Sequence, residues 1–327
     1  MIFSRQAIVL TGIFILVVAL AVGLGETPLS LAQFAEAWRP GSPAGEVLWS
    51  IRAPRTACAA LVGAALGLSG AVMQGLLRNP LADPGVLGVS ATAGLGASLA
   101  LVAGLAALPG AVELAALAGA VTAGAVLALA AGRLNAPEAL ILFGVALSAF
   151  AGALTALVFN LSPSPIATAE VLNWLMGSAA NRDWRDVAWA AGPMAVGAAL
   201  CAYAAPGLRA LSLGEETARL SGLPMGRLRA AAVVGTALLT GAAVATAGVI
   251  GFVGLAAPHL VRAGARHDPA AILAPSALAG AIMLVAADLA SRLLPIEAEL
   301  KLGVVTALFG APLFALIAWR ASRSWRT

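Results

Sequence analysis

Charged residues are scarce in this sequence of 327 residues. Asp, Glu, Lys and Arg together make up only 10% of it, whereas about 25% is usual in a soluble domain. Hydrophobic residues account for 61%, and the mean hydropathy is +0.96. Too few polar side chains remain to cover a water-exposed surface. The composition therefore excludes a soluble globular protein and predicts an integral membrane protein.

Lysine and histidine, which nucleotide-binding loops and metal sites commonly use, are also scarce. Lys301 is the only lysine and Leu300 precedes it, so the chain has no G-x-x-x-x-G-K-[ST] loop for nucleotide phosphates. The only histidines, His259 and His267, occur in no H-E-x-x-H motif, and no C-x-x-C pair is present. We therefore expect no enzymatic activity, no metal site and no bound cofactor. His259 is interpreted as a packed or interfacial residue.

The two cysteines, Cys58 and Cys201, both lie inside apolar runs. Free cysteine is among the most buried residue types, so two buried thiols are favoured over a disulfide. The net charge of +4 comes from arginines scattered through the loops and not from a basic block. The charge therefore indicates membrane topology and not binding of nucleic acid.

Long apolar runs are what the chain has in abundance. A membrane-spanning helix needs about 20 such residues, and a shorter segment at 251–261 can be buried as a broken helix inside a bundle. The first run, after Arg5, is long enough to be a retained helix and is favoured over a cleaved signal peptide. We predict an all-α membrane protein of about ten helices, with residues 1–327 forming one transmembrane domain. The clear apolar runs lie near 7–24, 56–77, 86–108, 114–132, 139–159, 187–208, 230–250, 270–291 and 302–319.

A ten-helix arrangement with both termini inside places most of the 19 basic residues on the cytoplasmic side, as the positive-inside rule requires. The pattern of residues 62–72 also recurs at 234–244. If this is a true repeat, five spans separate its two copies, and an odd number inverts one half relative to the other. The sequence therefore suggests an inverted repeat of helices 2–5 and 7–10.

Asp288 is the one carboxylate well inside an apolar run. A charge buried there is costly without a partner, which makes it a functional candidate by default. A proton-coupled secondary transporter could use Asp288 and would lose activity in Asp288→Asn. Arg292 lies one helical turn later, so an ion pair near the outer membrane edge is the simpler interpretation.

The largest hydrophilic insert, residues 211–229, lies on the predicted cytoplasmic side. Ser212 is a plausible N-cap, and Glu215 would complete a capping box three residues later. About two helical turns could follow before Gly222 and Pro224 end them. A stiff, charged segment of this kind suits docking to another protein, but the residues are equally consistent with an ordinary solvated loop.

The stretch RNPLADPGVLG at 78–88 interrupts two apolar runs. Pro80 and Pro84 lack an amide donor and disfavour helix at Asn79 and Asp83, so the preceding helix must stop here. The side chains of Asn79 and Asp83 can accept hydrogen bonds from nearby backbone amides, and Gly85 frees the turn. We predict a rigid cytoplasmic corner with a structural role.

Residues 52–94, RAPRTACAALVGAALGLSGAVMQGLLRNPLADPGVLGVSATAG, resemble the signature of the FecCD family, the permease subunits of ATP-driven importers for iron-siderophores, haem and vitamin B12. The stretches LGEETARLSGLP, GFVGLAAPHLVR and GVVTALFGAPLF match further family segments in the same order. The resemblance covers nearly the whole chain. It implies an importer permease in the inner (cytoplasmic) membrane and leaves the substrate open among siderophore, haem and cobalamin.

The resemblance also implies partners. These are a second copy of the chain forming a homodimer, two ATPase subunits of the ATP-binding-cassette (ABC) type, a periplasmic or surface substrate-binding protein, and the surrounding lipid. The insert would supply coupling helices that enter a cleft on the ATPase, through Gly214, Glu215, Glu216, Ala218, Arg219 and Gly222.

Two more sites follow from the resemblance. Arg52, Arg55 and Arg292 would be exposed at the outer mouth and meet glutamates of the binding protein, steering its docking. The corner at Asn79, Pro80, Asp83 and Pro84 would lie beside the translocation path, with a cytoplasmic gate at Asn135 and Ala136. Lys301 departs from the family, whose members usually have proline there.

Overall fold

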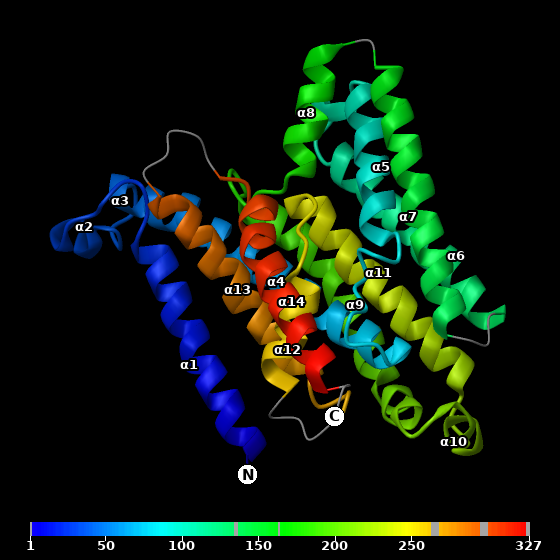
Figure 1. The fold of residues 1–327 in the computed structure, drawn as a ribbon. Coiled ribbons are helices and arrows are strands. Elements are labelled where there is room, and N and C mark those ends of the chain that lie inside the picture. The colour runs from blue at the N-terminus through cyan, green and yellow to red at the C-terminus, as the bar shows by residue number, and fades with distance from the viewer. Residues whose placement is uncertain (1, 134–136, 163, 263–267, 295–299, 325–327) are drawn as a thin grey trace.

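The computed structural model describes residues 2–133, 137–162, 164–262, 268–294 and 300–324, and every regular element in these ranges is a helix (Figure 1). Within these ranges, seven helical segments are long and apolar enough to cross a membrane. They are α1 (Ile2–Gly23), the continuous segment Pro43–Leu77 that ends in α4 (Ala53–Leu77), α6 (Ala111–Arg133), α7 (Pro137–Asn160), α9 (Trp184–Ser212), α11 (Met225–Ala247) and α13 (Leu273–Leu293).

Three more helices coincide with the remaining predicted runs. They are α5 (Val89–Val102), α12 (Val253–Val261) and α14 (Leu302–Ser324). The run at 86–108 is longer than its helix because Gly104 adopts a left-handed conformation, with φ of 74°, just after α5 ends. The prediction of an all-α membrane protein with one short helix near 251–261 is confirmed for the part of the chain that the structure describes.

The connections contain short helices that the apolar pattern did not predict. Ser30 begins one of them with a capping box, because its side chain accepts from Gln33 N while the Gln33 side chain accepts from the Ser30 amide. Ser164 caps another by accepting from Ile166 N. The elements are α2 (Leu31–Glu36), α3 (Pro43–Gly45), the π-helical turn η1 (Glu46–Arg52), the 3-10 turn η2 (Leu105–Ala107), α8 (Pro165–Leu175) and α10 (Glu215–Leu220).

The beginning of α1, the end of α14 and helix α10 lie at the same end of the bundle, which we call the α10 end (Figure 1). Helices α2, α3 and α8 lie toward the opposite end (Figure 1). Their positions show which charged residues share an end of the bundle.

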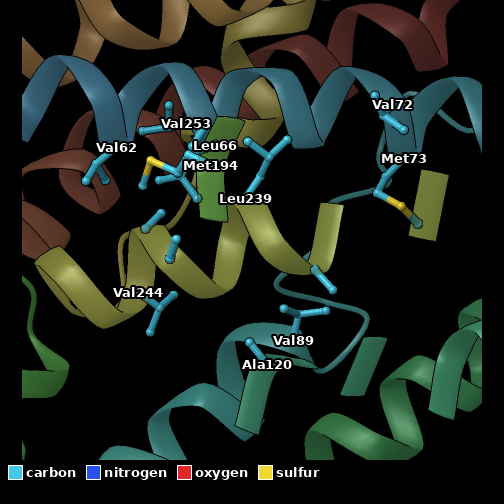
Figure 2. Close-up of a cluster of buried hydrophobic side chains, with 14 of the residues drawn as sticks. Val62, Leu66, Val72, Met73, Val89, Ala120, Met194, Leu239, Val244 and Val253 are labelled. Atoms are coloured by element: carbon cyan, nitrogen blue, oxygen red, sulfur yellow. The ribbon is translucent and has the colours of Figure 1, made fainter. Parts of the chain in front are cut away.

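Helices α4 and α11 form the centre of the fold. In the most apolar stretch of the segment that ends in α4, 72% of the residues are buried, and in that of α11 the share is 78%. Figure 2 shows Val62, Leu66 and Met73 of α4 in the same buried cluster as Leu239 and Val244 of α11. Helix α4 packs along α13, and α11 packs along α6. In the predicted repeat, α4 corresponds to α11 and α6 corresponds to α13. Each central helix thus packs against the equivalent helix of the other half, which supports the inverted repeat; the repeat itself stays a prediction.

Small residues let α4 and α13 approach until their backbones touch. A Cβ atom on Gly63 would lie 2.3 Å from Gly280 O, and one on Gly280 would lie 2.1 Å from Gly63 O. Close contact through glycine is a general means of packing membrane helices, because lipid offers little hydrophobic drive for their association. Cys58 of α4 and Cys201 of α9 are buried free thiols, as predicted.

Candidate functional site

A cavity of about 700 Å³ lies between the α4–α5 corner, α7, α8 and the segment joining α11 to α12. Its lining is overwhelmingly apolar. Asp83 is the one ionisable side chain among the described residues of this lining. Such a cavity suits a large ligand held by apolar contact and a few polar groups. The other polar side chains in the lining are Ser90, Ser148, Thr155 and Thr240.

The corner that forms one wall of the cavity has the structure predicted from its prolines. Helix α4 ends just before it. Leu81 N donates to Asn79 Oδ1 at 2.9 Å, and Gly85 N donates to Asp83 Oδ1 at 2.7 Å. Both predicted side chains therefore cap the backbone locally, and they hold the corner in one shape.

Asp83 also makes a contact that the sequence did not reveal. A Cβ atom on Gly254, in the first turn of α12, would lie only 2.5 Å from Asp83 Oδ2. Gln74 Nε2 of α4 donates to Gly254 O at 3.4 Å, while Gln74 Oε1 accepts from Arg262 at the end of α12. Burial raises the pKa of Asp83 and outweighs the hydrogen bonds from two backbone amides, which lower it. The corner, α4 and α12 thus form one connected unit at the cavity.

Asn135 and Ala136, the predicted gate residues, lie outside the described residues. Helix α7 begins directly after them at Pro137.

The predicted helix in the insert is present as α10, but it begins differently. Gly214 is its N-cap with φ of 108° and no side-chain cap, so the predicted capping box of Ser212 and Glu215 is wrong. Ser212 is instead the last residue of α9 and donates to Arg209 O at 2.7 Å. The reason is that α9 continues for another turn, because Ala210 and Leu211 are buried in the core. Gly222, with φ of 75°, follows α10 as predicted.

The two glutamates of α10 have different environments. Both carboxylate oxygens of Glu215 accept hydrogen bonds from Arg229 of α11, and Arg219 Nε lies 3.4 Å from Glu215 Oε1. Glu216 is exposed, while Ala218 is fully buried. Sequence reasoning selected Glu215 but missed Arg229, whose only signal was its place in the charged insert.

Burial raises the pKa of Glu215, but hydrogen bonding and the charges of Arg229 and Arg219 outweigh it, and the net pKa is lowered. A carboxylate with a lowered pKa contributes stability at every pH above its ordinary value and loses it only as the pH falls through the lower value. The ion pair between α10 and α11 is therefore intact at neutral pH.

The three arginines predicted at the outer mouth lie at the end opposite α10, but the expectation that they are exposed is wrong. Arg52 and Arg292 are only 5% and 6% exposed. Arg52 donates to Gly23 O at 2.7 Å and to Thr27 O, and Arg292 donates to Ala21 O at 3.0 Å. The two side chains thus satisfy backbone carbonyls at and beyond the end of α1, which otherwise lack helical partners.

Asp288 is the centre of this arginine cluster. Its carboxylate is fully buried, 2.8 Å from Arg55 Nε and 3.1 Å from an Arg292 nitrogen. The predicted pair with Arg292 is confirmed, and a second arginine from α4 joins it. Asp288 is absent from the described lining of the 700 Å³ cavity.

Comparisons with known proteins agree with this architecture. The model of the FecCD transport family matches residues 13–320. The vitamin B12 import system permease protein BtuC of Salmonella schwarzengrund (strain CVM19633) is 41% identical over 304 residues, which cover 91% of this chain and 92% of the relative. BtuC of Escherichia coli O157:H7 (strain EC4115 / EHEC) is 40% identical over 289 residues, 86% of each chain.

A solved structure, assigned to the metal-chelate type of ABC transporter and described as inward-facing, superimposes with a TM-score of 0.87 and 29% identity. The match covers 97% of this chain and 99% of the other. Family model, relatives and architecture extend over almost the same residues, and they place this chain in the FecCD transport family.

Proposed function

We propose that this chain is the permease subunit of an ABC importer that carries a bulky metal chelate, with cobalamin as the first candidate. The observation that carries the proposal is the family match over residues 13–320, made by a chain with a 700 Å³ apolar cavity among its helices. The cavity supports a large substrate bound without strong fixed charges. Cobalamin is placed first because the relatives at about 41% identity are named for vitamin B12 import.

ATP hydrolysis is assigned to separate subunits. The sequence has no phosphate-binding loop, so an importer built on this chain needs ABC ATPases as partners, and a substrate-binding protein to deliver its cargo. A second copy of the chain would complete the path, as a homodimer in the inner membrane. The α10 end of the bundle, where α1 begins and α14 ends, would then be cytoplasmic.

Helix α10 is proposed as the coupling element. It is a short charged helix at the end of the bundle, and Glu216 and Leu220 are exposed on it. An exposed Leu220 beside an exposed carboxylate suits insertion into a cleft of a partner. Because Glu215 is engaged with Arg229, the direct contact with the ATPase is assigned to Glu216 and Leu220.

Docking of a binding protein remains proposed for Arg52, Arg55 and Arg292. Arg52 and Arg292 would have to leave the α1 carbonyls before meeting carboxylates of a partner. The alternative, a proton carrier using Asp288, is not favoured because the carboxylate is held between two arginines.

Reconstitution in liposomes tests the proposal. The chain, its ATPase and its binding protein are assembled, and uptake of cyanocobalamin, haemin and a ferric siderophore is measured with and without ATP. We expect ATP-dependent uptake of cyanocobalamin. Uptake that needs no ATPase and follows a proton gradient would contradict the proposal.

The variant Glu216→Arg tests the coupling surface. We expect the ATPase to co-purify at least about tenfold less well, as a loss of about 1.4 kcal/mol in binding would produce. Glu36→Arg is the matched control, since Glu36 is an exposed glutamate on α2, at the other end of the bundle. Equal co-purification of both variants would remove Glu216 from the docking surface.

A further inference from the structure

We propose that Arg229 is the positioning residue through which α10 moves the cavity wall. The inference rests on the proposed function, in which the ATPase acts on α10. It assigns Arg229 and Glu215 to the transmission of movement, and it leaves the contact with the ATPase to other side chains of α10.

Helix α10 has only six residues, and an isolated helix of this length is not stable in water. Left-handed glycines stand on both sides of it, at Gly214 and Gly222, so its connections provide little stiffness. Its position depends on side-chain contacts with the bundle. Ala218 is fully buried beside α9, and Glu215 binds Arg229 of α11.

The Glu215–Arg229 contact is strong for a pair near the surface. Both side chains are more than two thirds buried, and the carboxylate uses both oxygens on the guanidinium. Charge-assisted contacts of this kind fix orientation as well as distance. A push or pull on α10 therefore reaches α11 at Arg229.

Helix α11 can carry the movement to the cavity. It is a single helix of 23 residues, and Thr240, which lines the cavity, lies about 16 Å along it from Arg229 at 1.5 Å per residue. Thr240 also donates to Ser69 of α4 at 3.2 Å. Because α11 is mostly buried against α4, α6 and α9, a shift at its end is passed on and not absorbed locally.

The experiment compares four reconstituted complexes. They contain the wild type, Glu215→Arg, Arg229→Glu, and the exchange variant with both substitutions. Uptake of cyanocobalamin, or of haemin or ferric siderophore if the wild type moves one of these, is measured together with ATP hydrolysis in the same liposomes. Arg227→Glu is the matched control. It makes the same charge change as Arg229→Glu, but at an exposed residue in the first turn of α11.

We expect each single substitution to lower the uptake per ATP hydrolysed by at least about tenfold, with ATP hydrolysis kept within about twofold. The exchange variant should recover most of the uptake, as expected for two residues that act as a pair. Arg227→Glu should behave as the wild type. If Arg229→Glu does not purify as a folded complex, Arg229→Gln takes its place, with the same loss expected in smaller degree.

Three results would overturn the inference. They are normal uptake in Arg229→Glu, failure of the exchange variant to recover, and loss of the ATPase from the complex, which would make the pair a docking element. Wild-type uptake without ATP would instead refute the proposed function. The two failures are therefore distinguishable.

Discussion

Replacing Asp288 by asparagine should destabilise the protein severely. The substitution keeps the shape of the side chain but leaves Arg55 and Arg292 facing each other without the carboxylate that lies 2.8 and 3.1 Å from them. Removing one partner from a buried ion pair typically costs about 3–5 kcal/mol, because the remaining charge has lost its compensation. We therefore expect a large fall in the thermal midpoint of the detergent-solubilised protein, and a low yield.

Asp268→Asn is the matched control for this prediction. Asp268 forms an ion pair with Arg209 at 3.0 Å, but both side chains are at least 35% exposed, and exposed pairs contribute about 0–1 kcal/mol. Its thermal midpoint should hardly change. If Asp288→Asn is as stable as this control and loses only proton-driven uptake, the carboxylate is a transport site and the secondary carrier is correct.

Adding one methyl group at Gly63 should weaken the contact between α4 and α13. The new Cβ would lie 2.3 Å from a backbone oxygen of Gly280, which cannot rotate away as a side chain would. The helices must separate, and overpacking of this kind typically costs about 1–3 kcal/mol. We expect Gly63→Ala to lower the thermal midpoint and to reduce transport, since α4 also lines the cavity through Leu66.

Gly192→Ala controls for the intrinsic effect of replacing glycine in a helix. Gly192 lies in α9, and nothing lies within 4 Å of a Cβ atom placed on it. Alanine is favoured over glycine in a helix by about 0.8–1 kcal/mol, so this variant should be as stable as the wild type or more so. If the thermal midpoint of Gly63→Ala equals that of Gly192→Ala, α4 and α13 are not in the contact described.

The comparison of sequence and structure shows which features are local. The apolar runs predicted the positions of α1, α4, α6 and α13, because a helix that crosses lipid must satisfy its own backbone and remain apolar along its length. The corner was also predictable, since Pro80 and Pro84 act on their immediate neighbours and Asn79 and Asp83 accept from amides two residues away. Among the charged residues, the pair of Asp288 and Arg292 was predictable because the two lie four positions apart on one helix, but the ion pairs between different helices were not.

The arginine cluster shows the limit most clearly. Arg55 and Asp288 are 233 positions apart, and no spacing rule relates them. The family resemblance implied that Arg55 is exposed at the outer mouth, and nothing in the sequence showed that Asp288 lies beside it. Likewise Glu215 and Glu216 are adjacent and chemically identical, yet one is held by Arg229 and the other is exposed. Which side of a short helix faces the bundle, and which side faces solvent, depends on how that helix packs against other helices.

The sequence by itself determined that this is a helical membrane protein without its own ATP-binding loop, where its long apolar helices lie, and which family it resembles. These properties follow from composition, from length against bilayer thickness and from local backbone chemistry. Only the tertiary structure decided that Arg52 and Arg292 are buried, that Asp288 has two partners, and that Glu215 joins α10 to α11. A charge between helices is stabilised by whatever the packing brings beside it, and that neighbour is set by the approach of segments distant along the chain.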